Sequence, residues 1–436
     1  MRELAYEIVF GTLEKEKHSD FLLHTIQERE KTLTVHQKSY LKRLAYGTIE
    51  RAVELDVVLN RFSKIKVCRM DAAVRTVLRM ALYEIRYMEQ VPDAAACNEA
   101  VELVRKKGAG KYAGFVNGVL RNIVRQKDRI RLEEEWVNLS LPEPLFQHLV
   151  SQYGKKTAEK IGRAFFEKEN VLTIHVDTNR IPFEEYISLL QKNNISFRRG
   201  YYMEHVLLLS GVSDVRTLPG FSEGFFFVQD ESSMLPVVCA GICPGNTVID
   251  VCAAPGGKTL HALHMLNRDG HVSARDVSSK KVNLLRENIQ RMQYKNVESK
   301  VWDGAKPDDE WRERADVLLA DVPCSGIGII GKKPEIKYHA LEQAERLVPL
   351  QRKICEASVT MLKPGGVFIY STCTINHAEN EENAAWLEEH LGLRRDSIDK
   401  FLPAVLRNRM TEQGMLQMLP GVQKTDGFFV ARFIKV

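Results

Sequence analysis

The sequence predicts a multidomain chain: an all-α bundle, then a small α+β module, then a larger α/β domain whose sheet is mostly parallel. Three observations predict this organisation. The chain has 436 residues, more than one compact core usually holds. Apolar residues recur at helical spacing through residue 128. From residue 245 onward, strand-like runs alternate with helix-like runs.

The first part of the chain is predicted to be helical throughout. Apolar residues follow the helical period in "AYEIVFGTL", "YLKRLAYGTIERAVELDVVLNRF" and "DAAVRTVLRMALYEIRYM", and Pro92 ends the third run. The runs "DAAACNEAVELVRKK" and "YAGFVNGVLRNIVRQ" continue the pattern. Because each such helix buries one apolar stripe, residues 1–128 are expected to form a bundle.

Positive charge is concentrated in this bundle. Residues 1–130 hold 24 Lys and Arg against 17 Asp and Glu, whereas the whole chain has a net charge of +5. This excess favours a polyanionic partner, most simply nucleic acid. The segments "NRFSKIKVCRM" and "RKKGAGK" could bind phosphates, and the alternative that they are solvated loops stays open.

Residues 129–170 are predicted to be a helical connector, with a break at Pro142 and Pro144. Three strand-like runs follow, "VLTIHVDTN", "ISFRRGYYM" and "HVLLLSG", and the helical run "FEEYISLLQKNN" separates the first two. We therefore expect a small α+β RNA-binding module over residues 171–232 and a further domain over residues 233–436.

Four predicted strands of this last domain end in a carboxylate, at Asp250, Asp276, Asp303 and Asp321. A fifth strand, "GGVFIYST", runs into Cys373, and "DGFFVARFIKV" predicts a final antiparallel edge strand. Sheets of this kind bind ligands at the carboxyl ends of their strands. One such acid alone could be a helix cap, but four in register indicate a ligand site.

The stretch "VIDVCAAPGGKT" at residues 248–259 is close to a phosphate-binding loop, but Cys252 stands where that loop has its first Gly. The four acids would also repel a triphosphate. S-adenosylmethionine carries a sulfonium, an ammonium and a ribose diol and no phosphate, so it suits this site, and Asp276 is placed to bind the ribose hydroxyls. A P-loop NTPase remains the rival interpretation.

Two cysteines follow neighbouring predicted strands, Cys324 in "DVPCSG" and Cys373 in "STCT". A thiolate that adds to carbon 6 of cytosine makes carbon 5 nucleophilic enough to attack a methyl sulfonium. The reaction also needs an acid at N3 and help with elimination. Cys373, Asp321 and Cys324 can fill these three roles, and the alternative is a pair of small buried residues.

The motifs "DVCAAPGGKT", "DVPCSGIG", "KKPEIKY" and "YSTCTINHAENE" resemble those of the Sun (Fmu) type of bacterial RNA cytosine-5 methyltransferases. "VPDAAACNEAVELVRKKG" and "GFVNGVLRNI" resemble the RNA-binding domain of the NusB antitermination family. The resemblance implies a NusB-like domain over residues 1–128 and a Rossmann-like class I methyltransferase domain with a seven-stranded sheet over residues 233–436. It implies methylation of a cytosine in 16S rRNA, with another RNA such as tRNA as the alternative.

The resemblance also implies roles for individual residues. Cys373 is the expected nucleophile, Cys324 the residue that aids release, and Lys258 a neighbour of Asp321 and the target base. The typical Ala after Asp321 is replaced by Val322, a mild change. The expected contacts to S-adenosylmethionine are Cys252, Ala253, Ala254, Pro255, Gly256, Gly257, Lys258, Asp276, Asp303 and Asp321.

Other classes of protein are disfavoured. Cys239 and Cys243 have no second pair at zinc spacing, so no metal site is predicted. No apolar run approaches the ~18 residues of a membrane helix, and Glu3 and Glu7 interrupt the first apolar run, so no signal peptide is predicted. A cytoplasmic monomer with 16S rRNA or a small-subunit precursor as its partner is expected. A non-catalytic RNA-binding protein is a second rival, but every residue that the chemistry needs is present.

Overall fold

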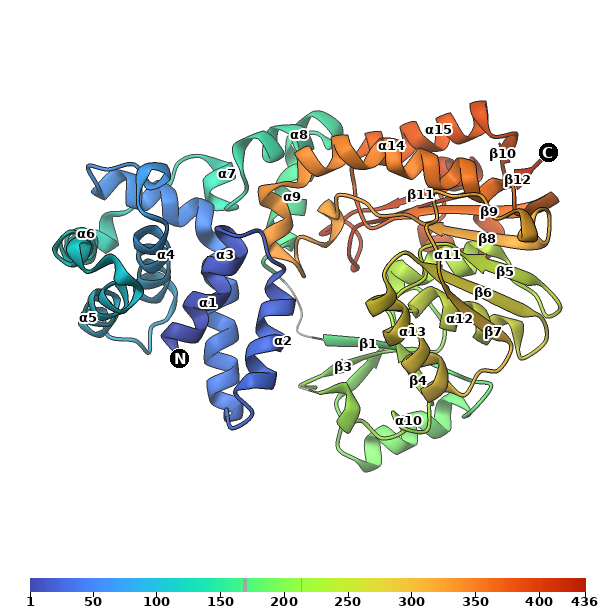
Figure 1. The fold of residues 1–436 in the computed structure, drawn as a ribbon, viewed down its shortest axis with the longest axis horizontal. Coiled ribbons are helices and arrows are strands. Elements are labelled where there is room, and N and C mark those ends of the chain that lie inside the picture. The colour runs from blue at the N-terminus through green and yellow to red at the C-terminus, as the bar shows by residue number, and fades with distance from the viewer. Residues whose placement is uncertain (168–170, 213) are drawn as a thin grey trace. The chain divides into compact units, whose positions relative to one another are not determined.

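A computed structural model of the chain describes residues 1–167, 171–212 and 214–436. The chain forms two compact units, which Figure 1 shows coloured along the sequence. The helical unit consists of Met1–Phe165 together with Ile330–His339, and the catalytic unit consists of Phe166–Ile329 and Ala340–Val436. Residues 168–170 of the predicted connector lie outside the described residues.

The helical unit confirms the all-α prediction for the first part of the chain. Its core joins α1, α3, α4, α5 and α6 through fully buried residues such as Ile49, Leu78 and Leu120. Thr34 forms a capping box at the start of α3, and Asp71 caps α4, which explains where these helices begin. α2 lies in the region predicted to be helical, although none of the five quoted apolar runs covers it. The helices are α1 (Arg2–Leu13), α2 (Ser19–Arg29), α3 (Val35–Phe62), α4 (Ala72–Tyr87), α5 (Asp93–Val104), α6 (Ala113–Gln126), α7 (Glu135–Asn138), α8 (Glu143–Tyr153) and α9 (Lys155–Ala164).

A segment from far along the chain completes the helical unit. Ile330–His339 contains the "KKPEIKY" motif and packs among the N-terminal helices. The Tyr338 hydroxyl donates to the carbonyl of Ile49 at 2.5 Å, and Lys337 Nζ donates to the carbonyl of Ser140 at 2.7 Å. Both side chains are largely buried, so this motif is a structural part of the helical unit.

The small α+β module within the catalytic unit has one more strand than predicted. Its sheet has the order β2-β3-β1-β4 and is antiparallel throughout. α10 (Phe183–Lys192) packs its buried Tyr186 and Leu190 into the same core as Ile174 and Phe226. The additional strand is β4, within "FFFVQD". The strands are β1 (Val171–Val176), β2 (Phe197–Arg199), β3 (Val206–Ser210) and β4 (Phe226–Val228).

The larger sheet confirms the predicted mostly parallel α/β fold. Its order is β10-β12-β9-β8-β5-β6-β7, and the five strands from β9 to β7 are parallel. Seven strands lie on this path as predicted, and an eighth, β11, pairs with β12. The strands are β5 (Thr247–Asp250), β6 (His271–Asp276), β7 (Val297–Val301), β8 (Ala315–Asp321), β9 (Leu362–Thr372), β10 (Leu393–Arg395), β11 (Met415–Met418) and β12 (Phe428–Lys435).

One detail of the edge differs from the prediction. The C-terminal strand β12 is antiparallel as expected, but it lies between β9 and the three-residue strand β10 instead of at the edge. Short runs such as "LRR" carry too little alternation to be recognised from the sequence. Both edges of β12 therefore pair with neighbouring strands.

Helices cover both faces of this sheet. Alternate residues of β5 and β8 enter different cores: Val248 and Leu319 belong to one, and Ile249 and Leu318 to the other. After β5 the chain continues to β6, which pairs with one edge of β5, whereas the later strand β8 pairs with the other edge. The strand order therefore reverses at β5. The helices are α11 (Glu231–Ala240), α12 (Gly257–Leu266), α13 (Ser279–Met292), α14 (Ala340–Val359), α15 (Glu381–His390) and α16 (Arg409–Glu412).

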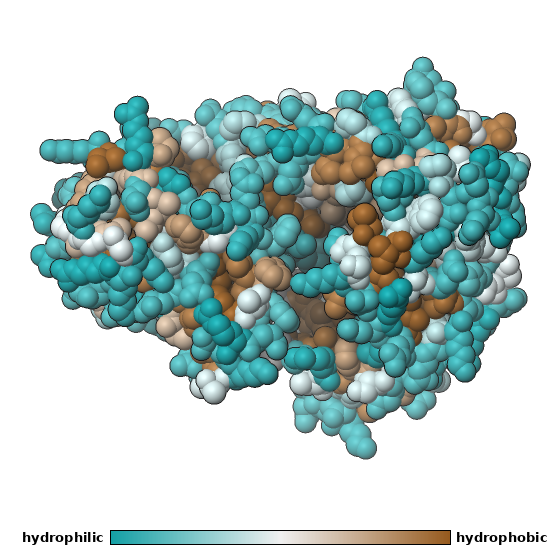
Figure 2. Space-filling view, viewed as in Figure 1, coloured by the Kyte–Doolittle hydropathy of each residue, from teal (hydrophilic) through white to brown (hydrophobic). Residues whose placement is uncertain are grey.

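The exposed surface is mainly polar. On the face drawn in Figure 2, hydrophilic residues cover most of the surface and apolar residues form separate patches. Within the described ranges, none of the helices combines the length and apolar character needed to cross a membrane.

Candidate active site

The reversal of strand order at β5 creates the place where a ligand is expected in a doubly wound sheet. β5, β6 and β8 end at Asp250, Asp276 and Asp321, and β7 ends two residues before Asp303. Parallel strands bring these ends to one edge of the sheet. The structure therefore places the four predicted acids in neighbouring positions, as their register along the sequence indicated.

The loop between β5 and α12 has a fixed conformation. The N–H of Ala253 donates to the carbonyl of Arg275 at 2.8 Å, which ties the loop to β6. Gly256 has a φ of +116°, and a Cβ at this position would lie 2.7 Å from Leu285 Cδ1. This backbone conformation favours glycine, so Gly256 lets the backbone turn tightly against Leu285 of α13.

Asp276 is connected directly to this loop. Its carboxylate accepts the N–H of Ser278 at 2.9 Å and that of Ala254 at 3.3 Å, and the residue is only 6% exposed. Asp303 is half-buried and accepts the N–H of Ala305 within its own turn at 3.1 Å. Asp276 is thus held at the loop, and Asp303 lies at the end of the next strand.

Asp250 lies beneath the loop and is completely buried. One of its carboxylate oxygens accepts the Thr259 hydroxyl at 2.8 Å, and the other has no hydrogen-bond partner within the described part of the chain. Burial raises the pKa of Asp250 to about 7. The neutral acid is therefore favoured at this depth, and Asp250 supports the loop from below through its hydrogen bond with Thr259.

Lys258 and Asp321 form an ion pair that a further residue completes. Lys258 Nζ lies 2.7 Å from one carboxylate oxygen of Asp321, and the Ser371 hydroxyl donates to the other oxygen at 2.8 Å. Burial alone would lower the pKa of Lys258, but the charge and hydrogen bond of Asp321 outweigh it and raise that pKa. Lys258 is therefore cationic, and Asp321 is its carboxylate partner. Ser371 was missed because nothing distinguishes it from other serines at the end of a strand.

The two predicted cysteines are in direct contact. Cys324 Sγ lies 3.1 Å from Cys373 Sγ, at the ends of the adjacent strands β8 and β9. The hydrogen bond with Cys373 and then burial raise the pKa of Cys324 well above its usual value. The protonated form of Cys324 is therefore favoured. Cys252, in the loop after β5, is a separate thiol whose pKa is also raised, in its case mainly by burial.

The residues present fit S-adenosylmethionine better than a nucleoside triphosphate. The first turn is tight and places backbone N–H groups beside Asp276, and the surrounding charges are mostly acidic. Among the described residues, Lys258 is the only cation that is paired with one of these carboxylates, and its partner is Asp321. A triphosphate would meet these carboxylates without a compensating charge, whereas a ribose diol and a sulfonium would not be repelled.

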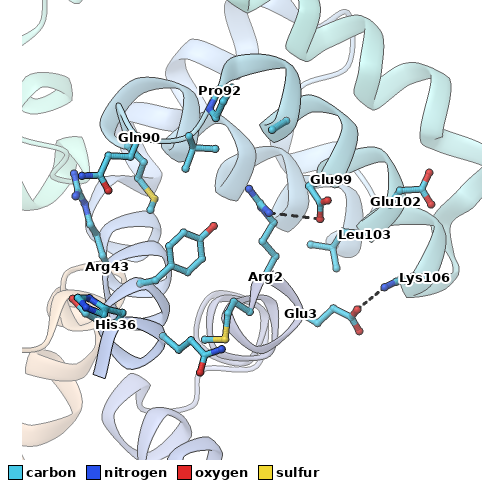
Figure 3. A pocket seen from close by; sticks show the side chains of 17 residues that line it. Arg2, Glu3, His36, Arg43, Gln90, Pro92, Glu99, Glu102, Leu103 and Lys106 are labelled. Atoms are coloured by element: carbon cyan, nitrogen blue, oxygen red, sulfur yellow. Dashed lines mark hydrogen bonds and ion pairs between the residues drawn. The ribbon is translucent and has the colours of Figure 1, made fainter. Parts of the chain in front are cut away.

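A cavity of about 840 Å³ opens in the helical unit (Figure 3). Arg2 points toward Glu99, 3.6 Å away, and Lys106 is paired with Glu3 at 2.7 Å. None of the predicted catalytic residues lines this cavity. Across the described ranges, no group of three or more His, Cys, Asp or Glu side chains is arranged to hold a metal ion.

The fold and the site together define the class of protein: a transferase with a Rossmann-like sheet and a pair of cysteines at the carboxyl ends of its strands. The family described as 16S rRNA methyltransferase RsmB/F matches residues 241–434, and the NusB family matches residues 1–125. The chain belongs to the RsmB/F family of 16S rRNA methyltransferases and carries an N-terminal NusB domain.

Relatives and solved structures agree with this assignment. The probable ribosomal RNA small subunit methyltransferase B of Bacillus subtilis (strain 168) is 33% identical, over 100% of this chain and 98% of its own length. Its counterpart from Cronobacter sakazakii is 28% identical over 100% and 98%. The crystal structure of PH0851 matches 99% of this chain and 98% of its own with a TM-score of 0.83 at 24% identity, which supports the fold. A methyltransferase homologue from Pyrococcus horikoshii is 26% identical over 69% of this chain and 98% of its own, with a TM-score of 0.60.

Proposed function

We propose that this protein methylates carbon 5 of a cytosine in 16S rRNA with S-adenosylmethionine as the methyl donor. The observation that carries the proposal is the contact between Cys324 and Cys373, 3.1 Å apart at the end of the sheet where the cofactor site lies. A methyltransferase that acts on an exocyclic nitrogen or a ribose hydroxyl needs no thiol. A pair of thiols suits a pyrimidine carbon, which must first be activated by covalent addition.

The two thiols have different roles in this proposal. Cys373 acts as the attacking thiolate, whereas the hydrogen bond with Cys373 and then burial raise the pKa of Cys324, which favours its protonated form. That thiolate adds to carbon 6 of the base, and the electron pair of the C5=C6 bond makes carbon 5 nucleophilic. The S–H group of Cys324 meanwhile stabilises the thiolate across 3.1 Å before the attack.

Asp321 acts together with Lys258 on the far side of the ring. The addition at carbon 6 increases electron density at N3, which then takes up a proton. Because Asp321 is paired with Lys258 at 2.7 Å, the proton is supplied through this pair and returns to it when the ring regains its aromaticity. Ser371 keeps the second carboxylate oxygen in place. The sequence suggested Asp321 as the acid, and this arrangement makes Lys258 its proton source.

The loop after β5 and the acids at the strand ends hold the cofactor. When bound, S-adenosylmethionine supplies a methyl group on a positively charged sulfur. Asp276 binds the ribose hydroxyls, and Asp303 and Asp321 lie at the ends of the flanking strands. The remaining contacts come from the loop residues Cys252, Ala253, Ala254, Pro255, Gly256 and Gly257.

The release step uses Cys324. Once Cys373 is bonded to carbon 6, its hydrogen bond with the Cys324 thiol is broken, and Cys324 is free to act as a base. Cys324 then loses its proton to solvent and, as a thiolate, takes the proton from carbon 5. The electron pair of that C–H bond re-forms the C5=C6 bond, the C6–S bond breaks, and its pair returns to Cys373. The proton lost to solvent is the one that the overall reaction releases.

The RNA is held partly by the helical unit. Its NusB domain and its positive charge support binding to an RNA backbone by shape and charge. The target cytosine must leave its stack to reach two thiols at the end of a sheet. 16S rRNA or a small-subunit precursor is the proposed partner, and a tRNA is the alternative.

Labelled S-adenosylmethionine tests the proposal directly. The purified protein is incubated with 16S rRNA and, in parallel, with tRNA, and bisulfite sequencing then locates 5-methylcytosine. We expect one protected cytosine in 16S rRNA and none in tRNA. Label in tRNA alone would favour the alternative substrate, and label at an atom other than carbon 5 would overturn the proposed chemistry.

A further inference from the structure

We propose that Glu379 is a positioning residue that holds the backbone of Cys324 in place for the release step. This inference rests on the covalent route proposed above. Glu379 is completely buried, directly after the loop that carries Cys373, and its carboxylate reaches across to the loop that carries Cys324. No step of the proposed chemistry involves Glu379, yet its carboxylate is surrounded by hydrogen-bond donors.

The carboxylate of Glu379 accepts four hydrogen bonds. One oxygen accepts the N–H of Ser325 at 2.8 Å and the side-chain amide of Gln351 at 2.9 Å. The other accepts the Ser325 hydroxyl and the Asn376 amide, the latter at 3.1 Å. The three donor residues are almost fully buried, as is Glu379 itself. A carboxylate can accept four such bonds, whereas a neutral side chain of the same shape cannot.

These bonds fix Cys324 from both sides in the sequence. Ser325 follows Cys324 and is bound to Glu379 through both its N–H and its hydroxyl. Pro323 precedes Cys324, and its carbonyl accepts the same Gln351 amide group that donates to Glu379, at 2.9 Å. Without the carboxylate, both neighbours of Cys324 lose their common support.

Cys373 depends on a different residue. Its neighbour Thr372 is paired with Phe429 in the sheet and donates its hydroxyl to Asn380 at 2.6 Å. The Asn380 amide donates to the carbonyl of Thr374, the residue after Cys373, at 3.1 Å. The two thiols are therefore supported mainly by different residues, Glu379 on the Cys324 side and Asn380 on the Cys373 side. One contact, between the hydroxyls of Ser325 and Thr374 at 2.8 Å, joins the two sides.

This separation predicts opposite effects from two conservative substitutions. Glu379→Gln replaces one oxygen with an NH₂ group, so the donors that pointed at that oxygen lose their acceptor. Cys324 is then loosened while Cys373 still forms the covalent adduct, and the adduct should accumulate. Asn380→Asp keeps the acceptor for Thr372 but sets an oxygen against the carbonyl of Thr374, so adduct formation should fall.

The experiment is a denaturing gel of protein incubated with 16S rRNA and S-adenosylmethionine, run together with a turnover assay. We expect Glu379→Gln to turn over about tenfold to a hundredfold more slowly, the usual cost of a small misplacement at a reacting centre. Its protein–RNA band should be stronger than that of the wild type, and its KM for S-adenosylmethionine should be unchanged. Asn380→Asp should be slow without such a band. Glu389→Gln, a substitution of the same type at an exposed position of α15, should match the wild type.

Ser325→Ala removes the hydroxyl bond to Glu379 and the hydroxyl contact with Thr374 but keeps the N–H bond to Glu379, and it is the second variant in case Glu379→Gln does not fold. It should also accumulate the band, and S-adenosylhomocysteine binding reports whether each variant is folded. A folded Glu379→Gln or Ser325→Ala variant that turns over slowly without a stronger band, while Cys324→Ala gives one, would overturn the role of Glu379. Absence of a band in Cys324→Ala itself would instead overturn the covalent route.

Discussion

The buried carboxyl group of Asp250 predicts how the stability of the catalytic unit depends on pH. Burial raises its pKa from 3.8 to about 7. A group whose pKa is higher in the folded state favours folding at low pH, and this contribution is lost as the pH rises through the folded-state value. The pH window of this loss therefore runs from about 4 to about 7 for Asp250.

The magnitude follows from the size of the shift. Each pKa unit corresponds to about 1.4 kcal/mol, so the full penalty of the ionised group above pH ~7 is about 4 kcal/mol. Part of this penalty is already present at pH ~5, and the free energy of unfolding falls by a further ~2–3 kcal/mol between pH ~5 and pH ~8. Asp250→Asn keeps the acceptor for the Thr259 hydroxyl and cannot ionise. The variant should therefore gain about 2–3 kcal/mol relative to the wild type over this range.

Urea unfolding of the cofactor-free protein measures this difference. Trp302, Trp311 and Trp386 lie in the catalytic unit, so tryptophan fluorescence mainly reports on the unit that contains Asp250. The unfolding free energies of the two proteins are compared at both pH values, and their difference is the quantity of interest. A difference that stays constant between the two pH values would show that Asp250 is ionised without penalty and would refute the reasoning.

Three further predictions concern the cofactor, the ion pair and the RNA. Asp276→Ala should weaken S-adenosylmethionine binding by about 1–3 kcal/mol without changing the fold, and unaltered affinity in calorimetry would remove Asp276 from the site. Lys258→Met removes the partner of Asp321 and should lower the rate of methyl transfer about a hundredfold or more, as loss of acid–base catalysis does; a single-turnover assay at normal rate would contradict this. Lys107→Glu combined with Lys111→Glu should weaken RNA binding and lower the slope of log affinity against log salt by about 0.9 for each phosphate that the variant no longer neutralises. An unchanged slope would show that "RKKGAGK" does not contact RNA.

The sequence predicted the elements that carry strong periodicity or a marked motif. The carboxylates at the ends of β5, β6 and β8 and the two cysteines after β8 and β9 could be placed because parallel strands bring their carboxyl ends together. The helices of the NusB domain could be recognised by their apolar spacing. Short elements such as β4 and β10 could not, because three residues carry no period.

The residues that support the site were harder to predict than the residues within it. Ser371 and Glu379 act through contacts between segments that are far apart in the sequence, Asp321 to Ser371 and Ser325 to Glu379. Nothing in the local pattern of "YSTCTINHAENE" distinguishes a buried acceptor of four hydrogen bonds from a helix-capping acid. The "KKPEIKY" motif was recognised as part of the resemblance, but its place among the N-terminal helices depends on tertiary packing alone.

The central claim is that Cys373 forms the bond to the base and Cys324 releases it. The most direct test is to digest the protein–RNA complex of Cys324→Ala with nuclease and protease and to locate the attached nucleotide by mass spectrometry. We predict a methylated cytidine nucleotide on the peptide that contains Cys373, and no adduct in Cys373→Ala or in the double variant. A nucleotide attached to Cys324 in Cys373→Ala, together with no adduct in Cys324→Ala, would reverse the two roles and contradict the account.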